Sequence, residues 1–149
     1  APLWSRGLGD VYKRQSTYGG NPLGSAVAIT ALDTIVKENM CERAEKLGES
    51  MRSSLKQIQN PLLLEVRGKG LLNAIVIDET KSTKGRSAWD LCLLLKDKGL
   101  LAKPTHQNII RLAPPLVISE EEMERGIKII TEALDDLDKV DTIPGAEAH

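Results

Sequence analysis

The chain has 149 residues, of which 41% are hydrophobic and 28% charged, with a formal net charge of -1; this composition favours one globular domain with a single core. The 20 basic and 21 acidic residues nearly balance, and aromatic residues make up only 3% with Phe absent. The sequence therefore offers neither a basic surface nor an aromatic platform for nucleic acid, its core is expected to be aliphatic, and it has no run of about 18 apolar residues that would cross a membrane.

The first segments of the chain are a tail and a helix. Residues 1–15 show no helix or strand period and are expected to contribute nothing to the fold. After the turn-rich residues 16–20, Asn21 and Pro22 suit an N-cap and a first helical position, which predicts a helix from Pro22 to about Lys37. Because this helix is apolar on several faces, we expect it to be buried by structure beyond a domain of this size.

The middle of the chain alternates between helix and strand patterns. Apolar residues at helical spacing predict an amphipathic helix over about 41–59. Residues 62–66 and 71–77 read as strands of a hairpin that turns at 67–70, where glycine permits a tight turn. Residues 78–86 are polar and predict a loop.

The last part of the chain has clear helix boundaries. Ser87 with Asp90 predicts a helix start, and Gly99 predicts its stop after Lys98. Short strands are expected over 100–103 and 108–112, around a turn at 104–107. Ser119 and Glu122 form a predicted capping box for a helix that reaches about Lys139, and residues 140–149 are expected to fray.

This order of elements predicts the fold class. Two helices, two strands, a helix, two strands and a helix fit an α/β domain of the α+β-like kind, with a small, mostly antiparallel sheet covered by helices.

Two segments could bind an anion. Residues 16–22 place two hydroxyls and a glycine pair before a helix N-terminus, where a phosphate or carboxylate is stabilised, although the same residues make an ordinary capped turn. Arg111 lies among apolar residues in a predicted strand. Its charge needs either solvent at a sheet edge or a carboxylate partner, and the pattern alone leaves both open.

Other polar residues point to solvent rather than to chemistry. Lys69 and Lys103 would be Schiff-base candidates only in an apolar pocket, and their places in a turn and at a strand end favour solvation. His106 lies in a loop without a second histidine or carboxylate at ligand spacing, so no metal site is expected. Cys41 and Cys92 are far apart in sequence, which favours free thiols.

Three stretches taken together resemble ornithine aminotransferases of the class III pyridoxal-phosphate-dependent aminotransferase family. They are STYGGNPLG at 16–24, VRGKGLLNAIVI at 66–77 and LLAKPTHQNIIRLAPPLVI at 100–118. The resemblance runs over about 16–137 and implies the C-terminal part of a fold-type-I transferase. Residues 16–38 would then end the large domain, residues 39–139 would form the C-terminal small domain, and residues 1–15 would be a non-family, artefactual tail.

The resemblance also implies roles for individual residues. Thr17, with Ser16 beside it, matches the position that contacts the cofactor phosphate of the neighbouring subunit in a homodimer. Arg111 matches the arginine that binds the substrate α-carboxylate. Neither Lys69 nor Lys103 matches the Schiff-base lysine, which is expected upstream of Ser16, so no catalytic residue is expected in this chain.

The implied reaction transfers the δ-amino group of L-ornithine to 2-oxoglutarate, giving glutamate 5-semialdehyde and glutamate, with pyridoxal 5'-phosphate as cofactor. The chain by itself is expected to be inactive. Alternatives are another class III enzyme that uses acetylornithine or 4-aminobutyrate, and a non-catalytic small α/β module. The resemblance allows the cytoplasm or the mitochondrial matrix, with the cytoplasm as the expectation.

Overall fold

The computed structural model describes residues 19–145. Ser16 and Thr17 lie outside the described residues, as do the expected tail 1–15 and the last four residues. The chain divides after Asn39 into two units, Ala1–Asn39 and Met40–His149, and each is described by itself.

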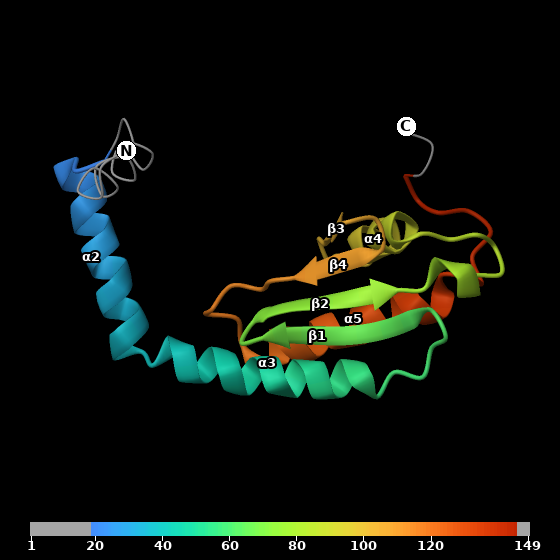
Figure 1. Ribbon diagram of the computed structural model, residues 1–149, viewed down its shortest axis with the longest axis horizontal. Helices are drawn as coiled ribbons and strands as arrows, with labels where there is room; N and C mark the ends of the chain where they lie inside the picture. Colours follow the sequence, from blue (N-terminus) through green and yellow to red (C-terminus); the bar gives the residue numbers. More distant parts are fainter. Residues whose placement is uncertain (1–18, 146–149) are drawn as a thin grey trace, which may run out of the picture. The chain divides into compact units, whose positions relative to one another are not determined.

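The described part of the first unit is helix α2, Pro22–Lys37 (Figure 1). The Asn21 side chain accepts a hydrogen bond from the Gly24 N–H at 2.7 Å, and Pro22 stands at the start of the helix. This confirms the predicted cap and bounds. Helix α2 buries none of its residues. Most of its large apolar side chains are exposed, namely Leu23, Val27, Ile29, Leu32 and Val36.

The second unit is a four-stranded antiparallel sheet with helices packed against it (Figure 1). The strand order is β1-β2-β4-β3, and the mixture of helices with an antiparallel sheet confirms the predicted fold class. The elements are α3 (Met40–Lys56), β1 (Leu63–Lys69), β2 (Leu72–Ile77), the 3-10 turn η2 (Glu79–Lys81), α4 (Ala88–Asp97), β3 (Lys103–Thr105), β4 (Ile109–Leu112) and α5 (Glu120–Asp136).

One face of the sheet carries the core. Side chains alternate between the two faces of a strand, and the alternate residues Ile75, Ile77, Ile110 and Leu112 are at most 5% exposed. They join buried residues of α3, α4 and α5 in one cluster. In Figure 1, α3 runs along β1 and α4 lies beside β3 and β4. The cluster has no aromatic member among the described residues, as the composition predicted.

The β1–β2 hairpin turns later than the sequence predicted. Residues 67–69 were expected in the turn, but they belong to β1, and the chain reverses at Gly70 between Lys69 and its partner Leu72. Gly68 is needed for a different reason. A Cβ at Gly68 would lie 2.3 Å from Oδ1 of Asn73, so this glycine permits close contact with β2 within the ladder.

Strand β3 is also displaced from its predicted position at 100–103. Pro104 was interpreted as a turn residue, but it pairs with Ile110 inside β3. Because β3 is an edge strand, the missing N–H of proline costs no ladder hydrogen bond on its open side. The reversal occurs instead at His106 and Gln107, both with positive φ.

The predicted helix caps are confirmed, but the predicted fraying of 140–149 is not observed as far as Gly145. Both Ser87 and Ser119 form capping boxes, with Asp90 and Glu122 respectively. After α5, Ile143 is only 3% exposed, and the Val140 carbonyl accepts a hydrogen bond from Arg86 at 2.8 Å. Burial of one side chain and pairing of the backbone hold this segment against the domain.

Candidate functional site

Strand β4 places Arg111 on the sheet face opposite the core. Its neighbours Ile110 and Leu112 are 0% and 5% exposed, so the two-residue period of a strand directs Arg111 to the other face. Arg111 is exposed, and among residues 19–145 no ion pair or hydrogen bond is formed by its guanidinium. The alternative of a sheet-edge position is wrong, because β4 lies between β2 and β3 and Arg111 is exposed on the face of the sheet. The alternative of a carboxylate partner stays a prediction.

A row of cations crosses this open face, which we define by the side chains of Arg67, Ala74, Arg111 and Lys103. The register pairs Arg67 with Ala74, Ala74 with Arg111, and Arg111 with Lys103. Directly opposite residues on adjacent strands have Cβ atoms about 5 Å apart. Three positive side chains thus share one row with a single small residue among them, and this arrangement suits an anion.

The chain after β4 is fixed by an arginine from α3. The Arg43 guanidinium donates hydrogen bonds to the carbonyls of Leu116 and Ile118. These contacts hold the segment that follows Pro114-Pro115, and with it the end of β4. Because β4 is central in the sheet, between β2 and β3, the backbone of Arg111 is held on both sides.

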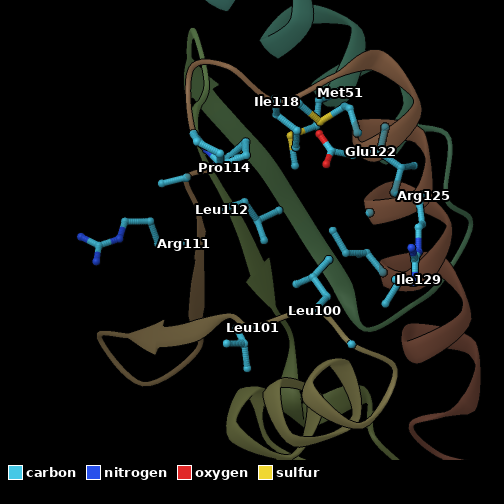
Figure 2. A pocket seen from close by; sticks show the side chains of 17 residues that line it. Met51, Leu100, Leu101, Arg111, Leu112, Pro114, Ile118, Glu122, Arg125 and Ile129 are labelled. Carbon is cyan, nitrogen blue, oxygen red and sulfur yellow. The ribbon is translucent and has the colours of Figure 1, made fainter. Parts of the chain in front are cut away.

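A cavity of about 470 Å³ lies on the core side of β4. Figure 2 shows Leu112 and Leu100 directed into it, whereas the Arg111 side chain points away from it. The Glu122 carboxylate at its rim accepts the Ser119 N–H at 2.9 Å, and hydrogen bonds from Ser119 lower the pKa of Glu122. The lining of the cavity is mostly apolar but includes Arg111 and Arg125, and the Glu122 carboxylate is engaged in helix capping.

The other polar candidates are solvated. Lys69 and Lys103 are exposed on strands, and His106 is exposed in the β3–β4 turn. Neither Lys69 nor Lys103 lies in an apolar pocket, which is the environment that would favour a neutral lysine. Within residues 19–145, no group of three or more potential metal ligands is found.

The stretch before α2 is described only from Gly19 onwards, so the phosphate contacts expected of Ser16 and Thr17 lie outside the described residues. What is described fits a phosphate. Helix α2 has no acidic residue in its first turn, and a Cβ at Gly20 would meet no atom within 4 Å. The N–H groups of a helix N-terminus without an acidic residue in its first turn favour an anion.

The fold and the sequence together define the class. The family model of class III aminotransferases matches residues 7–134, and the chain therefore belongs to the class III aminotransferase family, whose members use pyridoxal phosphate. The match begins inside the segment 1–15, and the artefactual origin of that segment stays a prediction.

Individual relatives are similar over most of the chain. It is 68% identical over 122 residues to an ornithine aminotransferase of Emericella nidulans, covering 82% of this chain and 27% of that protein. It is 53% identical over 119 residues to a mitochondrial ornithine aminotransferase of Rattus norvegicus, covering 80% and 26%. A crystal structure of an acetylornithine aminotransferase from Elizabethkingia anophelis is 54% identical, with a TM-score of 0.73 and coverage of 83% and 32%.

The chain thus spans about a quarter of the length of its curated relatives. Among residues 19–145, no helix is long and apolar enough to cross a membrane.

Sequence reasoning found Arg111 but missed the cation row. Lys103 was considered only as a Schiff-base candidate, and Arg67 was assigned to a turn. The missing information was the strand register: only a correct pairing of β1, β2, β4 and β3 places these residues side by side. Alternation of polar and apolar residues in 65–69 is the one signal that would have placed Arg67 in a strand.

Proposed function

We propose that this chain is the C-terminal part of a class III aminotransferase that transfers the δ-amino group of L-ornithine to 2-oxoglutarate. The observation that carries the proposal is the exposed Arg111 on the open face, free of any acidic partner among the described residues. The identity to ornithine aminotransferases supports the choice of amine. An acetylornithine substrate is the second candidate, because a structure of that name is 54% identical.

In this proposal Arg111 binds and orients a substrate carboxylate. A guanidinium presents a rigid, planar fork of N–H donors that pairs with both oxygens of a carboxylate. The buried neighbours Ile110 and Leu112 fix the strand on which Arg111 stands. The oxo acid and the amino acid are thereby held with one end away from the cofactor, which brings the reacting end towards it.

Pyridoxal phosphate supplies the electron-withdrawing ring for the amine transfer when it is bound. Ser16 and Thr17 are proposed to hold the cofactor phosphate of the neighbouring subunit through their hydroxyls, ahead of the N-terminus of α2. This role requires a homodimer. The lysine that carries the cofactor is proposed to lie in the part of the protein upstream of Ser16, so the chain alone would not catalyse the reaction.

A cytoplasmic location of the complete protein stays a prediction, with the mitochondrial matrix as the alternative. The name of the rat relative places that protein in mitochondria.

The test is Arg111→Lys in the full-length enzyme. Loss of the bidentate fork is expected to raise the KM for 2-oxoglutarate about tenfold or more, since a hydrogen bond to a charged group contributes roughly 1.5–3 kcal/mol. Stability towards urea should change little, because the side chain is exposed. An unaltered KM for 2-oxoglutarate would remove Arg111 from the carboxylate site, and with it the observation on which the proposal stands.

The identity of the amine substrate is tested with the full-length enzyme. Addition of L-ornithine, but not of acetylornithine, should change the absorbance of the bound cofactor. The reverse result would favour the second candidate.

A further inference from the structure

Lys103 and Arg111 are direct cross-strand partners on the open face. Both side chains are exposed, and among the described residues neither forms an ion pair or hydrogen bond. Like charges directly opposite one another in a sheet repel. This pair therefore gains from any anion that binds between the two side chains.

The open face around this pair also carries more positive than negative side chains. On the open face the four strands carry Arg67, Lys69, Lys103 and Arg111, against a single carboxylate, Glu65. That carboxylate is 3.7 Å from the Arg67 Nε, so it neutralises the far end of the row and leaves Lys103 and Arg111 uncompensated. Two uncompensated positive charges therefore lie next to each other at the β3–β4 side of the face.

We propose that Lys103 is a specificity-determining residue, the second cation of the carboxylate site at Arg111, and that it selects the dianionic oxo acid over the cationic amino acid. This inference rests on the proposed function. A positive charge beside Arg111 attracts 2-oxoglutarate, which has two carboxylates, and repels ornithine, which has two ammonium groups and one carboxylate. Lys103 has a positive charge but lacks the planar fork of an arginine. It therefore attracts a substrate carboxylate without fixing its orientation.

The experiment compares Lys103→Gln with the wild type in the full-length holoenzyme. The KM for 2-oxoglutarate should rise about two- to fivefold, the range of an exposed ion pair, and the KM for ornithine should fall or stay level. The wild-type KM for 2-oxoglutarate should also rise with ionic strength, and it should do so less in the variant. Lys103→Arg keeps the charge and should keep both constants.

The matched control is Lys46→Gln, which removes an exposed lysine of α3 without a contact to the open face. It should leave both KM values unchanged. A structural role of Lys103 would instead shift both constants in the same direction and would not be rescued by arginine.

Two results overturn the inference. If Lys103→Gln leaves both constants unchanged while Arg111→Lys raises that for 2-oxoglutarate, the proposed function stands and the role of Lys103 does not. If the constants for both substrates rise together in Lys103→Gln, the residue supports the fold and not the choice of substrate. If Arg111→Lys itself has no effect, it is the proposed function that fails.

Discussion

Single polar residues tie together segments that are far apart in the sequence. The Asp138 carboxylate accepts hydrogen bonds from the Ser82 hydroxyl at 2.6 Å and the Thr83 N–H at 2.8 Å. Burial works to raise the pKa of Asp138, but the hydrogen bonds from Ser82 and Thr83 outweigh it and lower the pKa below its ordinary 3.8. This one side chain therefore anchors the loop between β2 and α4 to the end of α5.

Replacing Asp138 by Asn should lower the free energy of unfolding by about 1–2 kcal/mol at pH 7, the usual contribution of hydrogen bonds to a charged group after allowance for solvent. Because the folded-state pKa is depressed, this stabilisation is fully present above the unfolded pKa of about 3.8 and is lost as pH falls through the folded value. Urea unfolding of the wild type and of Asp138→Asn at pH 7 and at pH 3 measures the loss of stability and its dependence on pH.

Glu49→Gln is the control for Asp138→Asn, because Glu49 is exposed in the middle of α3. It should leave stability nearly unchanged at both pH values. A difference between wild type and Asp138→Asn that grows as pH falls would contradict the lowered pKa.

At the scale of elements, α3 packs closely against the β1–β2 hairpin at Gly48. A Cβ at Gly48 would lie 1.7 Å from the carbonyl oxygen of Gly70, a distance that no side chain tolerates. The helix and the hairpin turn are further joined by Arg52, which donates to the Gly70 carbonyl and to Oδ1 of Asn73, each at 2.9 Å. The close contact at Gly48 allows Arg52 to reach the side chain of Asn73, a residue that is only 2% exposed.

Gly48→Ala should destabilise the domain by about 1–3 kcal/mol or more, since overpacking outweighs the gain in helix propensity of up to about 1 kcal/mol. Gly126→Ala in α5 is the matched control. There the nearest atom to a new Cβ is Cδ1 of Leu100 at 3.7 Å, an ordinary contact, so the change should be neutral or stabilising. Equal effects of the two substitutions on urea midpoints would show that the contact at Gly48 does not limit packing.

At the scale of the whole molecule, the two units differ in how far their apolar residues are buried. The unit that begins at Met40 has a continuous core, whereas α2 buries none of its residues and leaves Leu23 76% and Val36 74% exposed. A row of exposed apolar side chains of this length favours association with another surface.

The chain 1–149 is therefore expected to self-associate in solution, and residues 40–149 alone to be monomeric. Light scattering after size exclusion, at equal concentrations, measures the difference. A double substitution, Val27→Lys with Leu32→Lys, should lower the association of the longer chain. A monomeric chain 1–149 would mean that the apolar surface of α2 is not available to a second molecule.

The sequence by itself determined the helices, the class of fold and the family. Caps such as Asn21, Ser87 and Ser119 act through neighbours three residues away, and the apolar period of α5 repeats within one element, so local physical chemistry suffices to find them. The position of an arginine in an apolar strand likewise marked Arg111 as a candidate without a structure, and the carboxylate-binding role came from the family resemblance.

Only the tertiary structure decided the strand ends, the register and the row at Arg111. Pro104 and Gly68 have the local chemistry of turn residues, but an edge position and a close approach between strands keep both within the sheet. The pairing of Lys103 with Arg111 depends on which residues of distant segments face each other, and a shift by one residue would send Lys103 to the other face. Information of that kind comes from packing against the core and not from any short stretch of sequence.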